Sequence, residues 1–144
     1  MIQEHINPPF FFDIDIDTSN QEIAINSVVK IVKILSNEFN DDFDISIGYI
    51  KIIRLITEVV KEVESVSTIY HKLSSIDKKQ IAVHLGYLVL AEIYKSKPEL
   101  FNSYIKLYKE NVEPTLEMII NVSKVVNITN PELNKKINGC CNCF

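Results

Sequence analysis

The chain has 144 residues, of which 47% are hydrophobic and 24% charged, and its net charge is −4. This length suits one domain, and the composition is typical of a soluble globular protein rather than a disordered one. The acidic balance argues against general electrostatic binding of nucleic acid, so no nucleic-acid partner is expected.

The first predicted segment is an extended acidic arm over residues 1–17, which carries four acidic side chains and no basic one. Pro8 and Pro9 disfavour a helix, and apolar and acidic residues then alternate up to Asp17 as in a β-strand. A lone strand needs a surface or a partner strand, and exposed phenylalanines would form an apolar patch. The side chains predicted to bind a protein partner are Phe10, Phe11, Phe12, Asp13, Asp15 and Asp17. The alternative is a solvated terminal arm without this role.

A helical domain is predicted over residues 18–138, and its first helix begins near residues 18–20. Ser19 and Glu22 have the spacing of a capping box. Apolar residues then recur at helical intervals as far as Phe39, and the polar run at residues 40–42 ends the pattern.

The second predicted helix has the most regular pattern, with apolar residues alternating in steps of four and three from Ile45 to Leu73. This repeat fits either the seam of a coiled-coil dimer or the long helix of a bundle, and the width of the apolar stripe favours the bundle. Small hydroxyl residues at 65–68 can also divide the segment into two helices. The side chains assigned mostly to the opposite, polar face are Arg54, Glu58, Lys61, Glu62 and Glu64.

The third predicted helix is the centre of the fold and covers about residues 76–95. It opens after Ser74-Ser75, and residues 81–94 are apolar around the whole circumference, as in a helix enclosed by others. Gly86, one turn after Ala82, would let a neighbouring helix approach closely.

Three further helices are predicted from proline and capping patterns. A fourth helix begins at Pro98, Pro114 restarts the chain for a fifth, and a short sixth opens at Pro131 and ends at Asn138-Gly139. The expected fold is therefore all-α, a bundle of five to six helices around the central apolar helix, with an extended N-terminal arm.

The predicted tail, residues 139–144, contains Cys140, Cys141 and Cys143. Its last four residues have the length and terminal Phe of a prenylation signal, although its third position is not aliphatic. Interchain disulfides, a metal site and incidental thiols are the other interpretations.

Catalytic and metal-binding chemistry is not indicated. Asp13, Asp15 and Asp17 match the start of a calcium loop, but its required Gly and its final Glu are absent. The histidines, His5, His71 and His84, lack ligand spacing, and His84 is expected to be a hydrogen-bonded core residue. We expect no enzyme activity, no cofactor and no metal.

No secretion signal and no membrane-spanning run is visible. The expected setting is the cytoplasm or a virion, and membrane contact is expected only if the tail cysteines are lipidated.

Residues 50–60, 74–81 and 112–124 resemble a pattern in small helical proteins of large nucleocytoplasmic DNA viruses. In that pattern a long helix precedes a turn of small residues with paired Lys, and a later Pro begins a helix ending in Val-Ser-Lys. The high content of Ile, Asn and Lys fits an AT-rich genome of this kind. The resemblance implies a virion component.

The expected function is that of a non-enzymatic structural or protein-interaction protein, a minor capsid or virion-associated component whose partner is the capsid or a second copy of itself. The alternative is a viral host-response inhibitor that resembles the B-cell-lymphoma-type apoptosis regulators, which bind partner helices in a groove. The Asn-Trp-Gly-Arg signature of that family is absent from this chain.

Overall fold

A computed structural model describes residues 17–39, 42–69 and 73–129. These residues form α3 (Thr18–Leu35), α4 (Ile45–Ser67), α5 (Ser75–Ile93) and α6 (Pro98–Thr129), and no strand occurs among them. The prediction of an all-α fold is confirmed. The predicted count of five to six helices is wrong for the described residues, because the expected fourth and fifth helices form the single helix α6.

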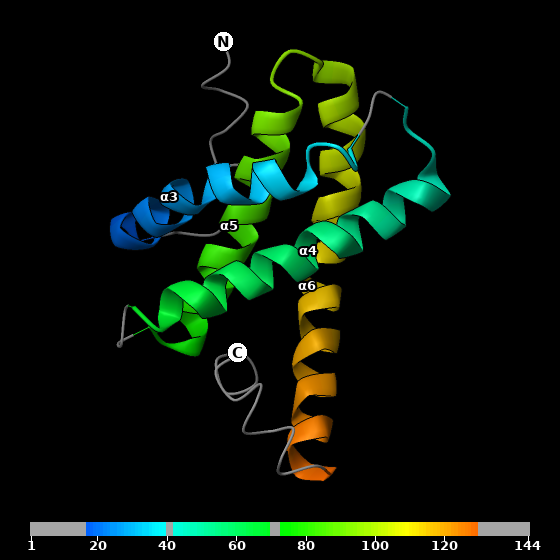
Figure 1. Ribbon diagram of the computed structural model, residues 1–144. Coiled ribbons are helices and arrows are strands. Elements are labelled where there is room, and N and C mark those ends of the chain that lie inside the picture. Colours follow the sequence, from blue (N-terminus) through cyan, green and yellow to red (C-terminus); the bar gives the residue numbers. More distant parts are fainter. Residues whose placement is uncertain (1–16, 40–41, 70–72, 130–144) are drawn as a thin grey trace.

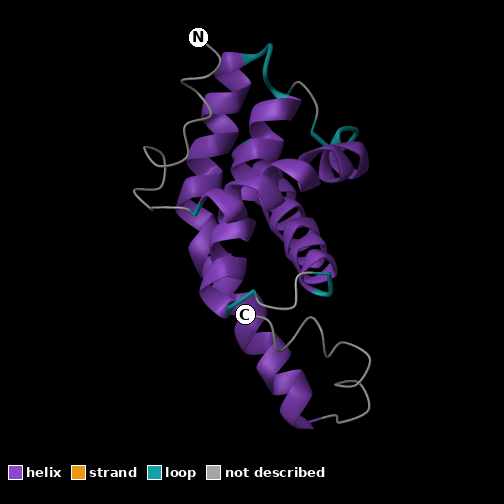
Figure 2. Ribbon diagram, turned by 90° about the vertical axis from the view of Figure 1, so that its left-hand side faces the viewer, coloured by secondary structure: helices purple, strands orange, loops and turns teal. Residues whose placement is uncertain are grey.

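The four helices pack as two pairs, one across the other (Figure 1). In the first pair α3 and α4 run antiparallel, since Lys30 contacts Glu62 while Glu38 contacts Arg54. In the second pair α5 leads through a short turn into α6, and the two also contact each other. The C-terminal part of α6 extends away from the other helices (Figure 2).

The prediction of a central helix is confirmed for α5, which packs against each of the other three described helices. Every residue from Ile81 to Tyr87 is buried, so the helix has no solvent-facing side over this stretch. The predicted close approach at Gly86 is also confirmed, because the Tyr108 ring of α6 lies directly against this glycine. The Tyr108 hydroxyl donates a hydrogen bond of 2.7 Å to the Val83 carbonyl.

Two of the described helices, α4 and α5, begin at a side-chain cap. Ser74 and Asp77 form a reciprocal capping box at α5, and the Asp44 side chain accepts hydrogen bonds from two backbone amides of α4. The box expected from Ser19 is wrong, because α3 begins at Thr18 and Asp17, two residues before Ser19, is its N-cap residue. Ser19 is thus already inside the first turn, where its side chain cannot cap the helix.

Pro114 does not end the helix that contains it, contrary to the sequence-based expectation. Proline removes one amide donor and leaves the carbonyl four residues earlier, that of Glu110, without its helical partner. Pro114 and Glu110 are both exposed, so water can satisfy this carbonyl. Buried neighbours at Val112 and Leu116 hold the helix against the core on the opposite side.

The seven-residue repeat of α4 is buried only in its middle. Ile52, Ile56, Val59 and Val63 are at most 1% exposed. Ile45 and Tyr49, in contrast, are exposed, and the helix ends at Ser67, as the small residues at 65–68 allowed. The expected polar face is also wrong in part. Three acidic side chains assigned to it are buried, namely Glu58, Glu62 and Glu64.

Aromatic side chains join the segment between α3 and α4 to the second helix pair. Tyr104 lies at their centre and is stacked on Tyr94, with the ring centroids 5.1 Å apart. Phe39 and Phe43 meet the same ring edge-on at 5.2 Å and 5.0 Å. The Tyr104 hydroxyl donates to the backbone carbonyl of Asp42. This cluster fixes the position from which α4 begins.

Several predicted features lie outside the described residues. These are the arm up to residue 16, the sixth helix and the tail from residue 139.

Candidate functional site

The most unusual surface of the described structure is the first nine residues of α4. Five large apolar side chains there are between 41% and 68% exposed, whereas exposed apolar residues are normally scattered singly. We call these side chains the α4 patch. They are Ile45, Ile47, Tyr49, Ile50 and Ile53.

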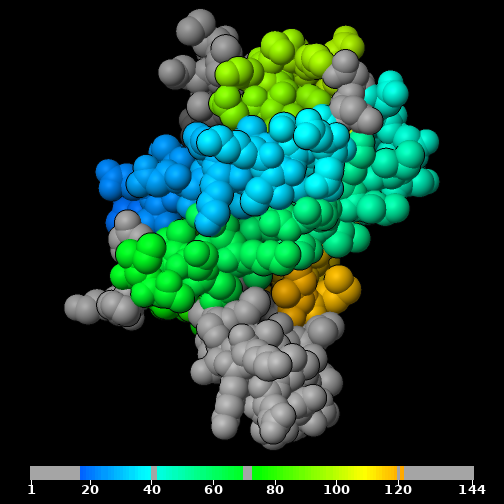
Figure 3. Space-filling view, in the orientation of Figure 1, coloured from blue at the N-terminus to red at the C-terminus, as the bar shows by residue number. Residues whose placement is uncertain are grey.

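The α4 patch is exposed because of where α4 lies. The start of the helix extends past α3 and α6 at the right of the view (Figure 1). Gly48 still touches the Leu107 side chain of α6, so the helix is anchored to the core at this level. Further along, α3 and α4 lie side by side across the face turned toward the viewer (Figure 3). The α4 patch therefore lies next to the solvent-facing surface that α3 and α4 form together.

The charged side chains of α4 are divided by sign. All three basic ones, Lys51, Arg54 and Lys61, are exposed or half-exposed. The acidic ones are buried: Glu58, Glu62 and Glu64. The surface that α4 presents to solvent is therefore apolar at its start, and the charged side chains exposed beyond it are basic ones, of which Arg54 and Lys61 are paired with acidic side chains.

Ion pairs hold α3 and α4 together along their antiparallel contact. The Lys30 Nζ lies 2.9 Å from a Glu62 carboxylate oxygen, and Arg54 Nε lies 3.3 Å from Glu38. Arg54 also pairs with Glu58 one turn later on the same helix, and Lys61 reaches Glu58 at 3.3 Å. The carboxylates buried in this contact are thus neutralised by the cations at its edge.

The ion pairs with Arg54 and Lys61 change the pKa of the Glu58 carboxyl. Burial by itself raises its pKa, but the hydrogen bonds from Arg54 and Lys61 outweigh burial, so the pKa lies below its ordinary value. The hydrogen bond to Glu58 likewise raises the pKa of Arg54. Glu58 therefore stays ionised at neutral pH and has a role in holding the helix pair together.

His84 is a core residue, as predicted, and is 2% exposed on the central helix. The predicted hydrogen bond does not form at Nδ1, which has no partner among the described residues. Burial lowers the pKa of His84 to about 4, so the side chain is neutral at physiological pH. His84 does not line the surface hollow at the start of α6.

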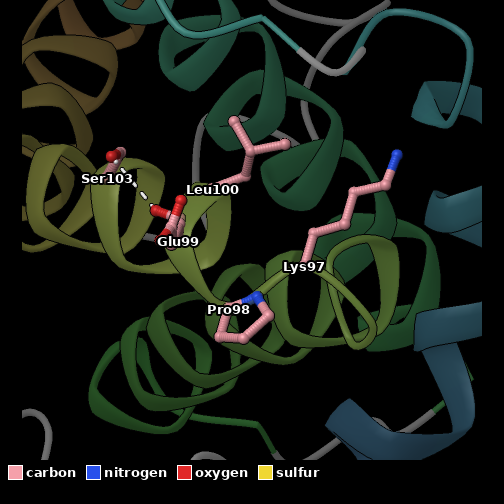
Figure 4. Close-up of a pocket in the computed structure, with 5 residues that line it drawn as sticks. All are labelled: Lys97, Pro98, Glu99, Leu100 and Ser103. Atoms are coloured by element: carbon pink, nitrogen blue, oxygen red, sulfur yellow. Dashed lines mark hydrogen bonds between the residues drawn. The ribbon is translucent and has the colours of Figure 1, made fainter.

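A surface hollow of ≈ 600 Å³ lies at the start of α6 and is lined by Lys97, Pro98, Glu99, Leu100 and Ser103 (Figure 4). The Ser103 hydroxyl donates to the Glu99 carbonyl of its own helix at 3.2 Å. The Lys97 side chain extends away from Ser103 in this view. Nothing in this lining pairs a nucleophile with a base, so the hollow offers no catalytic arrangement.

Of the six residues predicted from the sequence to bind a partner, only Asp17 lies within the described ranges. Asp17 is exposed, and its backbone carbonyl accepts a hydrogen bond from the Gln21 amide. The candidate lipidation or disulfide residues, Cys140, Cys141 and Cys143, also lie outside. Across residues 17–39, 42–69 and 73–129, no group of three His, Cys, Asp or Glu side chains could hold a metal ion.

The α4 patch was not predicted, although the sequence contains a signal for it. Six of the nine residues from 45 to 53 are large and apolar, which is more than one face of a helix can bury. Ile47 and Ile50 in particular fall outside the seven-residue repeat. An apolar residue on the face away from that repeat is a sign of a second contact surface.

Comparison of the chain with protein-family models, with curated proteins and with solved structures finds no match. No helix among the described residues is long and apolar enough to cross a membrane.

Proposed function

We propose that this protein is a non-enzymatic protein-interaction component, and that the α4 patch is the surface through which it binds another protein. The observation that carries the proposal is the grouping of five exposed apolar side chains on one short helical stretch. Contiguous apolar surface of this kind is typical of protein-binding sites, and a rigid aromatic such as Tyr49 is a common anchor.

The anchoring of α4 supports the proposal. Leu55 and Ile56, directly after the patch, are at most 1% exposed, and the Asp44 cap fixes the first turn. The patch is thus displayed on a rigid helix rather than on a loop, which lowers the entropy lost on binding. The alternative function, binding of partner helices in a groove, has less support, because the hollow at the start of α6 has charged side chains in its lining.

The narrower expectation, a minor virion component with the capsid as partner, stays a prediction that goes with the resemblance described above. The α4 patch supports binding of a protein and does not distinguish among partners.

A selection from a displayed peptide library tests the proposal. The full chain is the bait, and the same chain with Ile50→Asp is the counter-bait. We expect peptides that bind the unchanged chain and lose at least tenfold in affinity for Ile50→Asp. Ile76→Asp is the matched control, because Ile76 is 69% exposed on α5, outside the patch, and its replacement should leave binding unchanged. Peptides that ignore both substitutions, or no peptides at all, would overturn the proposal.

A further inference from the structure

We infer that α3 is an acid-sensitive cover over the central helix: as the pH falls, α3 separates from α5 while α4, α5 and α6 stay packed together. This inference concerns a conformational change built into the fold and does not depend on the α4 patch. It draws on the position of His84, on the contact between the starts of α3 and α5, and on the chemistry of the contact between α5 and α6.

The face of α5 that α3 covers includes His84. Asn20, in the first turn of α3, is 3% exposed and donates hydrogen bonds of 3.0 Å to Asp77 and 3.1 Å to Gln80. Because an α-helix has about 3.6 residues per turn, a residue seven after Asp77 and four after Gln80 falls on the same face. The α6 side lies nearly opposite, since Gly86, two residues after His84, contacts a tyrosine ring of α6. His84 is therefore enclosed by α3.

The side of α3 that faces this contact gives the His84 ring no charged partner. Ala24 and Ser27 follow Asn20 in steps of four and three, so they share its face of the helix, and both are at most 4% exposed. The Nδ1 atom of His84 has no hydrogen-bond partner among the described residues. The contact thus encloses the ring in its neutral form.

No nearby charge compensates a proton on His84. Burial alone lowers its pKa, to about 4. The charged side chains of α3 between its ends, Glu22, Lys30 and Lys33, are exposed. The titratable side chains buried on the neighbouring helices and on α5, none of which adds to the effect of burial on this pKa, include Glu58, Glu62, Glu64, Lys78, Tyr104 and Tyr108. Separation of α3 brings the ring into water, so acid favours the separated form.

The carboxylate of Asp77 responds to acid in the same direction. The hydrogen bond from Asn20 is the largest cause that lowers the pKa of Asp77, followed by those from Ser74. A carboxyl whose pKa is lowered by folding stabilises the fold above its ordinary pKa and loses this effect as the pH falls through the folded pKa. His84 acts first, because its ordinary pKa of 6.5 lies above that of Asp77, which is 3.8.

The contact between α5 and α6 does not depend on groups that titrate in this range. The Tyr108 hydroxyl donates to a backbone carbonyl of α5 at 2.7 Å, and Tyr87 meets the Phe101 ring edge-on at 6.0 Å. Burial raises the pKa of Tyr87 to about 12 and that of Tyr108 well above its ordinary value, so both stay neutral in acid. The ion pair of Lys79 with Glu117 is exposed and contributes little.

The far end of α3 stays attached when its start is released. Phe39, four residues after the end of α3, is 4% exposed and meets the rings of Tyr94 and Tyr104 edge-on at 6.3 Å and 5.2 Å. Residues 36–38, between α3 and this anchor, are exposed. The turn at residues 36–38 is therefore the place about which α3 moves away from α5.

Native-state hydrogen exchange of the full chain, measured by mass spectrometry at pH 7 and pH 5 in low concentrations of urea, tests the inference. The rates are divided by the intrinsic exchange rate at each pH. A detached α3 lacks the packing that keeps it helical, so its amides exchange. At pH 5 we expect the amides of α3 to be less protected than those of α6 up to residue 116 and to depend less on urea, as for an opening that exposes only part of the core.

The open form of α3 should rise roughly 20-fold from pH 7 to pH 5, because His84 regains its ordinary pKa on opening. His84→Leu should remove most of this rise. Lys79→Met is the matched control on the same helix, since it removes only the exposed pair with Glu117 and should leave the rise unchanged.

Three results would contradict the inference. Equal protection and equal urea dependence of α3 and α6 at pH 5 would show that the chain opens as one unit. A rise in His84→Leu as large as in the unchanged chain would exclude His84 as its cause. If His84→Leu does not fold, the unchanged chain still decides, because Asp77, with its ordinary pKa of 3.8, adds almost nothing between pH 7 and pH 5, and a rise of less than about threefold would overturn the inference.

Discussion

The Tyr108 ring occupies the space that a side chain at Gly86 would need. A β-carbon at Gly86 would lie 2.5 Å from Cζ and 2.7 Å from Cε1 of Tyr108, well inside van der Waals contact. The hydroxyl of the same tyrosine is held by the Val83 carbonyl, so the ring cannot swing away without breaking a buried hydrogen bond. The absence of a side chain at one residue therefore sets how closely α6 approaches the central helix.

Gly86→Ala is expected to lower the free energy of unfolding by about 1–3 kcal/mol, because overpacking outweighs the gain in helix propensity of about 1 kcal/mol. Denaturation in urea measures this change. Gly48→Ala is the matched control. Its β-carbon would meet only the end of the Leu107 side chain, at 2.9 Å, and the Phe43 ring, at 3.3 Å. The Leu107 end can move aside, so a smaller loss is expected, and an equal loss in both variants would contradict this account.

Pro114→Ala is expected to raise the free energy of unfolding by about 1–3 kcal/mol. The substitution restores an amide that can donate to the Glu110 carbonyl, and the exposed ring of Pro114 takes no packing with it. Thermal or urea denaturation checks the change. Glu113→Ala, at the neighbouring exposed position, should change stability by less than about 0.5 kcal/mol. A loss of stability in Pro114→Ala would show that the proline is required in α6.

Stability is expected to fall between pH 6.5 and 4 because of His84. Its pKa is about 4 in the folded chain and 6.5 ordinarily, so the unfolded chain binds the proton first as the pH falls. The loss amounts to roughly 3 kcal/mol and is complete near pH 4, below which both states are protonated. His84→Leu should flatten the dependence in this window. Urea midpoints at a series of pH values measure it, and parallel curves for the two chains would contradict the assignment.

Arg54→Met is expected to lower the free energy of unfolding by about 1–2 kcal/mol at pH 7, since it leaves the buried Glu58 with one cation fewer. The pKa of Glu58 lies below 4.5 in the folded chain, so the contribution of the pair is full above that pH and is lost as the pH falls through the folded pKa. The difference between the two chains should therefore shrink in acid. Lys95→Met, which breaks an exposed pair with Glu92, should change stability by less than about 0.5 kcal/mol. Equal effects of the two substitutions would contradict a special role for Glu58.

The sequence by itself determined that the fold is helical and which helix is central. Capping at Ser74 and the apolar circumference of residues 81–87 are local properties, and local properties survive folding because they need no partner from elsewhere in the chain. Gly86 could be recognised from the sequence as a place where another helix approaches closely, because the absence of a side chain is also a local property. The partner that makes the approach, Tyr108, was not recognisable.

Only the tertiary structure decided which apolar and charged residues are covered. Ile45 and Ile52 belong to the same repeat, yet Ile45 is exposed and Ile52 is buried, because α4 extends past the helices that cover its middle. Glu58 and Glu62 are buried because α3 and the turn after it lie alongside α4, where Lys30 pairs with Glu62 and Arg54 pairs with both Glu38 and Glu58. Pro114 sits inside a helix because the core holds the chain on both sides of it. Burial depends on the position of neighbouring helices, and a repeat read along one helix contains no information about where its neighbours end.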